Sequence, residues 1–390
     1  MNQVQSQQRL ITELQTKGLR LSSRGKGQVS RRGGAGPSDH QAVTIDGTTV
    51  MVPIYTESAW DSPFSAEQTS DGVHIYEADA QSGQLIDRIP LTNISFTNTP
   101  AFYSGATADG IPYSHIATLH SKDVLATTIL QTCIRYESRK KACKFCSIGQ
   151  SLRAGRTIAH KTPEQLAEVA KAAVELDGIS QMIMTTGTPA TPDRGAKVLA
   201  DSARAIKAVV DIPIQGQCEP PADPSWYQVM KDAGIDTLGM HLEVLGQSLR
   251  EEILPGKAED TLEDYMVAFE QAVAVFGRGQ VSTYILAGLG DSAQYIREVS
   301  ERLIAIGVYP FVVPFVPIRG TPLEDHPSPS ADFMESILKP LGQRLFEAGM
   351  TSETSKAGCN KCGACSTLSG YERDAKDQAD MPMAQMGGCR

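Results

Sequence analysis

Three of the eight cysteines fall within one short stretch, as Cys133, Cys143 and Cys146. The stretch directly follows an apolar and β-branched run over 124–130, which predicts a buried strand. Three thiolates can bind three irons of a [4Fe–4S] cluster and leave the fourth iron open to a small molecule, whereas a fourth cysteine would close the site. Phe145, just before the last cysteine, is expected to pack beside the cluster. The alternatives are a zinc site, because zinc also takes cysteines two residues apart, and scattered core cysteines.

A second group of cysteines lies near the C-terminus, as Cys359, Cys362 and Cys365. Two residues separate neighbours in this group, which is the spacing at the start of bacterial ferredoxin motifs. We interpret the group as a metal-binding hairpin that holds an auxiliary iron–sulfur cluster, with zinc as the alternative. Cys389 is a candidate fourth ligand, and a free thiol in a frayed end is the other interpretation. Cys218 has no cysteine nearby in sequence and is expected to be a packed thiol.

The composition is that of an ordinary globular chain. It has 390 residues, is 41% hydrophobic and 21% charged, and carries a formal net charge of −9. We therefore expect one large domain with an appendage, or two domains, and no binding to nucleic acid or to an anionic membrane by bulk electrostatics. No apolar run approaches the roughly 20 residues that span a bilayer. Closely spaced cysteines behind an N-terminus without a secretory signal favour metal sites in a reducing cytoplasm over disulfides.

Two segments are expected before the first cysteine group. Residues 1–40 are predicted to form a basic, glycine-rich arm. A phosphate-binding loop at Gly33–Gly36 is less favoured, because the segment lacks both the preceding strand and the Lys-Ser/Thr ending of such a loop. Residues 41–122 read as a β-rich cap, with a hairpin that turns at Asp46 and Gly47. The single histidines of the cap are expected to be structural or solvated rather than ligands: His74, His115 and His120.

Residues 123–349 alternate between strand and helix patterns. Strands are predicted at 124–132, 181–185, 212–215, 237–242, 281–286 and 309–316. Helices are predicted at 163–176, 196–209, 226–233, 262–276, 293–306 and 331–348. Six successive βα units imply a parallel sheet with helices outside it. The expected fold is therefore an α/β partial (βα)6 TIM-like barrel, with the N-terminal β-rich extension before it and a cysteine-rich tail at 350–390.

Ligand-binding residues of such a barrel are expected just after each strand. The second predicted strand is followed by Thr186, Gly187 and Thr188, whose small side chains let the backbone approach a ligand. Glu219 follows the third strand and is expected to orient a substrate or to hydrogen-bond the ligand. Glu243 follows the fourth strand, where a solvated surface residue is the alternative. A glycine turn that starts at Gly288 follows the fifth.

The first cysteine group lies in a basic segment. Such a segment favours reduction of an anionic cluster, attracts an acidic reductase or holds a carboxylate substrate, and a plain solvated face is an equal alternative. Between residues 135 and 161 the segment has one acidic residue, Glu137. Its basic residues are Arg135, Arg139, Lys140, Lys141, Lys144, Arg153, Arg156 and Lys161.

Over roughly residues 120–330 the chain resembles the radical S-adenosylmethionine (radical SAM) enzymes, with a biotin-synthase-like core. That family has three cysteines with an aromatic residue before the last, although nine residues separate Cys133 from Cys143 here instead of the usual three. The resemblance implies that the amino group of S-adenosylmethionine lies at the turn of Thr186, Gly187 and Thr188, which lacks the acidic residue of its usual form. It also implies that Glu243 binds the ribose hydroxyls or the amino group, and that the turn at Gly288 runs beside the adenine.

The resemblance further implies reductive cleavage of S-adenosylmethionine to methionine and a 5′-deoxyadenosyl radical, which removes hydrogen from a C–H bond of a small-molecule substrate. Such an oxidoreductase or transferase needs an electron from a flavodoxin- or ferredoxin-type reductant, and the sequence assigns no catalytic residue. One alternative is sulfur insertion of the biotin- or lipoyl-synthase type, with the auxiliary cluster as donor. The other is a non-catalytic iron–sulfur electron carrier or a zinc protein.

A narrower resemblance extends over a longer span that includes residues 31–37 and the nine-residue cysteine gap. On these features the chain is similar to bacterial radical SAM proteins that are encoded beside a nitrilase, an acetyltransferase and a flavoprotein. This resemblance suggests a small nitrogen-containing substrate, in nitrile or cyanide assimilation.

Overall fold

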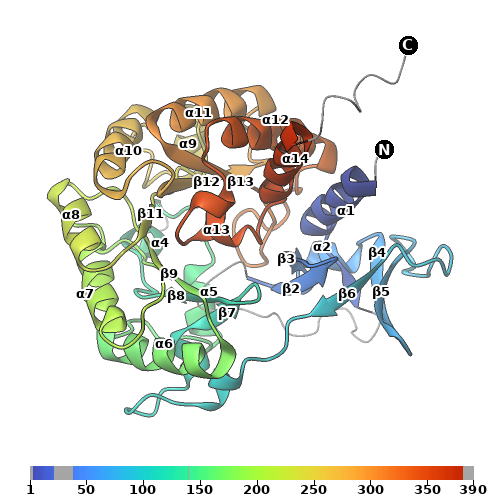
Figure 1. Ribbon diagram of the computed structural model, residues 1–390, viewed down its shortest axis with the longest axis horizontal. Helices are drawn as coiled ribbons and strands as arrows, with labels where there is room; N and C mark the ends of the chain where they lie inside the picture. Colours follow the sequence, from blue (N-terminus) through green and yellow to red (C-terminus); the bar gives the residue numbers. More distant parts are fainter. Residues whose placement is uncertain (1–2, 22–37, 139, 381–390) are drawn as a thin grey trace.

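A computed structural model of the chain describes residues 3–21, 38–138 and 140–380. The structure has a mixed α/β fold, in which a curled seven-stranded sheet carries helices on its outer face and a six-stranded sheet lies beside it (Figure 1). The predictions for Gly33–Gly36, Arg139 and Cys389 fall outside the described residues. Within the described part of the chain, no helix is both long enough and apolar enough to cross a membrane.

The curled sheet has the strand order β13-β12-β11-β10-β9-β8-β7. Six of its strands run parallel and follow one another in sequence: β8 (Val124–Thr128), β9 (Gln181–Thr185), β10 (Ile214–Gln217), β11 (Thr237–Gly239), β12 (Val281–Ala287) and β13 (Val308–Pro314). The seventh, β7 (Thr118–His120), pairs antiparallel with β8. Because β7 and β13 form the two edges of the sheet, the curl stays open between them.

The helices of this unit begin at clear signals in the sequence. They are α6 (Pro163–Asp177), α7 (Ala196–Lys207), α8 (Ser225–Asp232), α10 (Leu262–Phe276), α11 (Ala293–Ile306) and α12 (Ala331–Glu347). Thr162 and Thr261 each form a capping box, which satisfies backbone N–H groups that the first turn leaves free. Gly178 ends α6 in the left-handed conformation that glycine adopts without strain. The apolar faces of these helices bury one continuous core against the sheet.

The six-stranded sheet has the order β1-β4-β5-β6-β2-β3. Its strands are β1 (Arg20–Leu21), β2 (His40–Ile45), β3 (Thr48–Pro53), β4 (Phe64–Thr69), β5 (Gly72–Glu77) and β6 (Thr92–Phe96). The predicted hairpin at Asp46 and Gly47 is present between β2 and β3, with both turn residues at positive φ. Helix α1 (Gln3–Lys17) lies within the residues predicted to form the N-terminal arm, and it packs Ile11 and Leu14 into a separate apolar core under this sheet.

The C-terminal cysteine segment is part of the fold. Residues 359–362 form one helical turn, α13 (Cys359–Cys362), so the prediction of a hairpin is wrong. The backbone N–H groups of Gly358 and Cys359 donate to the side chains of Gln181 and Gln215, at 2.7 and 3.1 Å. Gln181 is the first residue of β9, so the segment packs toward the ends where the parallel strands start. The chain then continues into α14 (Leu368–Asp380), which packs on α12.

Short elements connect these units. They are α2 (Glu57–Trp60), α3 (Tyr113–Ile116), α4 (Ile134–Glu137), α5 (Ile148–Arg153), α9 (Gln247–Ile253) and the 3-10 turns η1 (Ala101–Ser104) and η2 (Ser352–Thr354). Three of them, α4, α5 and α9, lie in the loops after β8 and β11. Those loops carry the candidate site.

Candidate functional site

The first cysteine group is held against the loop after β9. Cys133 directly precedes α4, and the N–H of Ile134 donates to the carbonyl of Thr188 at 3.0 Å. Gly187 packs so closely on this segment that an added Cβ would lie 2.1 Å from the carbonyl oxygen of Thr132. The predicted turn and the predicted cluster loop are therefore in direct contact, and glycine at position 187 is required by space.

The three thiols of the loop share one environment. Burial raises the pKa of Cys143, the negative charges of Glu243, Cys146 and Cys133 raise it further, and Lys257 opposes them. Burial also raises the pKa of Cys146 to about 11, with the charge of Cys133 among the contributions. The charge of Cys133 therefore acts on the pKa of both Cys143 and Cys146, although nine residues separate Cys133 from Cys143 in the sequence. Because metal binding requires thiolates, loading of this site releases protons.

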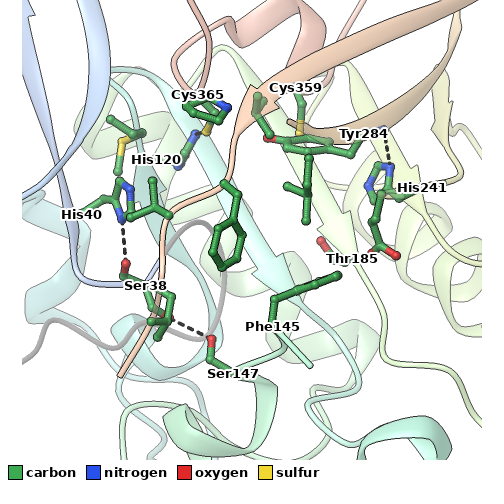
Figure 2. A pocket seen from close by; sticks show the side chains of 18 of the residues that line it. Ser38, His40, His120, Phe145, Ser147, Thr185, His241, Tyr284, Cys359 and Cys365 are labelled. Carbon is green, nitrogen blue, oxygen red and sulfur yellow. Dashed lines mark hydrogen bonds between the residues drawn. The ribbon is translucent and has the colours of Figure 1, made fainter. Parts of the chain in front are cut away.

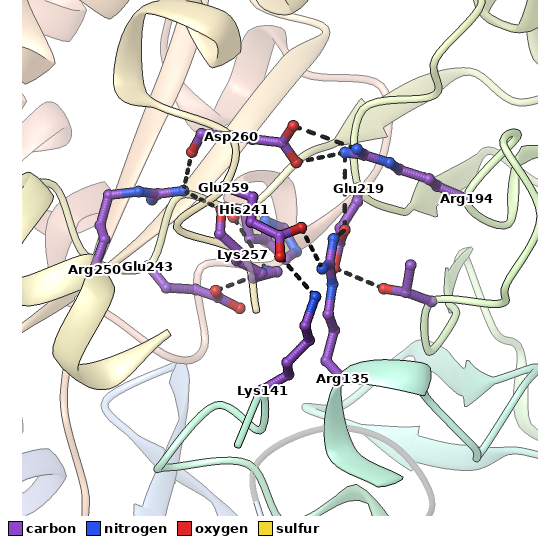
Figure 3. Close-up of polar contacts among 11 residues, drawn as sticks. Arg135, Lys141, Arg194, Glu219, His241, Glu243, Arg250, Lys257, Glu259 and Asp260 are labelled. Carbon is purple, nitrogen blue, oxygen red and sulfur yellow. Dashed lines mark hydrogen bonds and ion pairs between the residues drawn. The ribbon is translucent and has the colours of Figure 1, made fainter. Parts of the chain in front are cut away.

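Glu243 and Lys257 form an ion pair beside these thiols, with Nζ 2.7 Å from Oε2 (Figure 3). The two side chains are only 16% and 12% exposed, so the interpretation of Glu243 as a solvated surface residue is wrong. Burial lowers the pKa of Lys257, but Glu243 and other anionic groups outweigh it and hold that pKa well above its usual value. Glu243 has a φ of 64°, an uncommon conformation for a residue with a side chain. No sequence pattern indicated Lys257, which lies in a loop.

Glu219 is the centre of a second polar group (Figure 3). It accepts from the guanidinium of Arg135 at 3.1 Å and from the hydroxyl of Thr188 at 2.7 Å, while Arg194 lies 3.9 Å away. Burial opposes ionisation of Glu219, but Lys257, Arg135 and Thr188 together hold its pKa below the usual value. Glu219 therefore ties the cysteine loop to the turn after β9.

A fully buried arginine organises the loop that carries the ion pair. Arg250 lies in α9, and its guanidinium donates to four carbonyl oxygens at 2.9 to 3.3 Å (Figure 3). These carbonyls belong to Leu242, Val244, Lys257 and Asp260. Since two of them flank Glu243 and one is that of Lys257, Arg250 positions both partners of the ion pair.

A cavity of about 350 Å³ lies inside the curled sheet. Its walls include Phe145 from the first cysteine group, Glu243 from the loop after β11, and Cys359 and Cys365 from the second group (Figure 2). Most of the remaining lining is aliphatic or aromatic, and it includes Tyr284 of β12. The structure thus places the two cysteine groups on walls of one cavity, although 212 residues separate Cys146 from Cys359 in the sequence.

The second cysteine group is surrounded by side chains from both sheets. Gln217 of β10 approaches Cys359, with Nε2 3.1 Å from Sγ, and the hydroxyl of Tyr284 contacts both Cys359 and Cys365. Burial raises the pKa of all three thiols. The described cysteines form no disulfide.

Among the described residues, no three His, Cys, Asp or Glu side chains surround one point as the ligands of a single metal ion. The thiolates of a [4Fe–4S] cluster each bind a different iron, so they stand farther apart than the ligands of one zinc ion. Both groups of three thiols, unpaired and half-buried, fit a cluster of this kind.

The remaining predicted residues occupy different places. Phe145 packs beside Cys143 in a small apolar cluster with Val244 and Phe315. The Thr186 hydroxyl donates to the carbonyl of Gly187. Gly288 has a φ of 105° and packs against Pro329, and it is not among the residues that line the cavity.

Part of the basic segment around the first cysteines is paired with carboxylates or buried. Arg135 pairs with Glu219, and Lys141 and Lys144 pair with carboxylates on the loop after β11, namely Glu259 and Glu252. Lys161 is buried and donates to the carbonyl of Thr128, and burial lowers its pKa to about 7. A plain solvated face, one of the interpretations of this segment, is therefore wrong for Arg135 and Lys161, whereas Lys141 and Lys144 are 50% and 36% exposed.

Acidification should destabilise the cavity wall at His40. Its Nδ1–H donates to the carbonyl of Ser38 at 2.7 Å, and burial lowers its pKa to about 4, from an unfolded value near 6.5 (Figure 2). The stabilisation is therefore present above pH 6.5 and is lost as the pH falls toward 4. Between pH 7.5 and 5 we expect His40→Gln to lose about 2 kcal/mol less unfolding free energy than the wild type. Urea unfolding of the iron-free protein measures this, and equal losses in both proteins would contradict it.

The sequence matches the Radical SAM superfamily over residues 140–303, a span that contains Cys143 and Cys146 but not Cys133. One relative is the bacteriochlorophyllide c C-7(1)-hydroxylase of Chlorobaculum limnaeum, 24% identical over 353 residues, which cover 84% of each chain. Another is a probable dual-specificity RNA methyltransferase, RlmN, of Trichormus variabilis, 27% identical over 132 residues, which cover 34% of this chain and 36% of that protein.

Solved structures with similarity to the chain include two enzymes. Methylornithine synthase has 18% sequence identity and a TM-score of 0.43, over 58% of this chain and 62% of its own. A radical SAM methyltransferase from Sphaerobacter thermophilus has 15% identity and a TM-score of 0.44, over 75% and 76%. The chain carries a radical SAM superfamily domain and is a radical SAM enzyme, with a [4Fe–4S] cluster and S-adenosylmethionine as its cofactors.

Proposed function

We propose that this enzyme cleaves S-adenosylmethionine reductively in the cavity and functionalises a C–H bond of a small metabolite. The observation that carries the proposal is the shared cavity. The cysteine loop contributes Phe145 to its wall, the ion-paired Glu243 comes from the loop after β11, and mostly apolar side chains form the remainder. The apolar part of such a lining excludes water from a reactive species, and the polar side chains among it, such as Gln217 and His241, can orient a substrate.

The proposal assigns the predicted residues roles in binding the cluster, in binding S-adenosylmethionine or in positioning the loop. Cys133, Cys143 and Cys146 hold the cluster that, when bound, supplies the electron for cleavage. The turn of Thr186, Gly187 and Thr188, which touches the cysteine loop, binds the amino group of S-adenosylmethionine. Glu243 accepts hydrogen bonds from the same molecule, and its ion pair with Lys257 holds the carboxylate in place. Arg135, Thr188 and Arg194 engage Glu219, so we assign it the orientation of the loop rather than direct catalysis.

The six parallel strands β8 to β13 form, in this proposal, the partial (βα)6 barrel of the family. The loops that carry the proposed ligands lie at the carboxyl ends of β8, β9 and β11, as expected for a barrel of this kind. The turn at Gly288 follows β12 at the same end, and we propose that it runs beside the adenine.

Sulfur insertion is the second candidate function, and the position of Cys359 and Cys365 favours it. An auxiliary cluster on the cavity wall lies where it can meet a substrate radical. Loss of cluster sulfide with turnover distinguishes this function from hydrogen removal alone. The interpretation as a non-catalytic electron carrier or zinc protein is set aside because the chain is a radical SAM enzyme.

The chemistry requires a one-electron reductant, and we propose a flavodoxin- or ferredoxin-type protein for this part. The nitrile or cyanide connection stays a hypothesis that neither the site nor the relatives support. A cytoplasmic location and the four-part division at residues 40, 122 and 349 also stay predictions.

The proposal is tested with anaerobically purified and reconstituted full-length protein. With dithionite and S-adenosylmethionine we expect 5′-deoxyadenosine and methionine in equal amounts, and neither product when dithionite or S-adenosylmethionine is omitted. Protein with a full complement of iron and sulfide that forms no 5′-deoxyadenosine with any reductant would contradict the proposal.

A further inference from the structure

The end of strand β7 contacts the second cysteine group. His120 is the last residue of β7, and its Nε2 lies 3.7 Å from the Sγ of Cys365 (Figure 2). The next residue, Ser121, hydrogen-bonds Cys362 and has a φ of 58°, which is uncommon for a residue with a side chain. Two consecutive residues from the edge strand of the curled sheet therefore reach two of the three cysteines.

The neighbours of the three sulfurs differ in what they offer a metal. Gln217 presents its amide nitrogen to Cys359, and an amide N–H donates to a thiolate but does not bind iron. The hydroxyl groups of Ser121 and Tyr284 would have to lose a proton to bind as anions. An imidazole binds iron as a neutral ligand through the ring nitrogen that carries no proton. Histidine also replaces cysteine as a ligand in some iron–sulfur centres.

His120 is buried, at 8% exposure, and lines the cavity together with Cys359 and Cys365. Cys218, the described cysteine outside the two groups, packs in the barrel core beside Glu219. Within residues 3–21, 38–138 and 140–380, the cysteines therefore provide three ligands for the auxiliary cluster, and His120 is the metal-binding side chain next to them.

We propose that Nε2 of His120 is the fourth protein ligand of the auxiliary iron–sulfur cluster, beside Cys359, Cys362 and Cys365. The inference rests on the auxiliary cluster of the proposed function. The 3.7 Å separation places both donor atoms beside one space and does not fix which iron each binds. A neutral ligand in place of a thiolate leaves the cluster less negative, which makes it easier to reduce. His120 also places the iron that lacks a thiolate on the cavity wall.

The test uses the full-length Cys143→Ala/Cys146→Ala protein, in which the auxiliary cluster is the remaining source of signals. After reduction with dithionite, pulsed electron paramagnetic resonance should detect a strongly coupled nitrogen that changes when histidine is labelled with 15N. This measurement needs no change at His120. Iron and sulfide without coupling to histidine nitrogen would overturn the inference and leave the auxiliary cluster intact, whereas absence of iron and sulfide would overturn both.

Variants at position 120 in this background identify the residue. His120→Ala should lose the nitrogen coupling, and His120→Cys should lose the coupling, keep the iron and lower the midpoint potential, because a thiolate adds negative charge. His74→Ala is the matched control, since that ring is also buried but bonds Asp71 in the turn between β4 and β5, and it should keep the coupling. Coupling that survives in His120→Ala, or disappears in His40→Ala, would overturn the assignment. Loss of iron in Cys389→Ala without any histidine coupling would do the same.

Discussion

Replacement of Cys143 and Cys146 together by alanine is expected to reduce 5′-deoxyadenosine formation to the level of a protein-free control. The two thiols are half-buried beside Glu243 and Lys257, whereas the described cysteines of the second group lie on another wall of the cavity. The remaining ligand, Cys133, cannot hold a cluster alone. We expect about four fewer irons per chain, measured after anaerobic reconstitution.

Cys218→Ala is the matched control for this change. Cys218 is buried in the barrel core and takes no part in either cysteine group. We expect it to lose stability as a core substitution does and to keep both its iron and its production of 5′-deoxyadenosine. Wild-type levels of product from the double variant would show that the first cysteine group is not the site of cleavage.

Arg250→Met is expected to lower the unfolding free energy by about 4 kcal/mol. The guanidinium is fully buried, and its removal takes one donor away from each of four carbonyl oxygens, of which those of Leu242 and Lys257 keep a backbone N–H as a second donor. The loop that carries Glu243 and Lys257 then loses its anchor. We therefore also expect weaker binding of S-adenosylmethionine, measured by equilibrium dialysis below the unfolding temperature.

The control for Arg250 is Arg302→Met in α11. Arg302 is 45% exposed and pairs with Glu263, which is 70% exposed, at 2.8 Å. Such a surface pair contributes less than about 1 kcal/mol. Chemical unfolding of the two variants should therefore give clearly different losses. Equal losses would mean that the carbonyl contacts of Arg250 do not stabilise the loop.

The helices and strands that local signals define were predicted well from the sequence. α10 and α11 begin and end at the predicted residues, because Thr261 and Ser292 cap their first turns and glycines end them. β10 starts and ends two residues later than predicted. Its start follows Pro213, which has no N–H to donate to a sheet.

The polar groups that organise the site could not be predicted in the same way. Nothing in the sequence around Arg250 sets it apart from other arginines in short helices. Its four partners are backbone carbonyl oxygens, which every residue has, so no residue type marks them in the sequence. Lys257 differs from other loop lysines in its ion pair with Glu243, a contact that forms when the chain folds. His120 was expected to be structural or solvated, because the sequence places it 245 residues from Cys365. Contacts of this kind depend on how the sheet curls, which no local pattern encodes.

The position of α1 has a consequence for synthesis of the protein. The helix is translated long before its partners, because Thr12 bonds Thr367 and Gln15 donates to the carbonyl of Ala364. At about 5 to 20 residues per second, the 355 residues by which Thr367 follows Thr12 in the sequence take roughly 20–70 s to translate. During that time α1 lacks a large part of its native contacts. Completion of the fold, and with it the wall that carries Cys359 and Cys365, is therefore a late event that follows translation of residue 367.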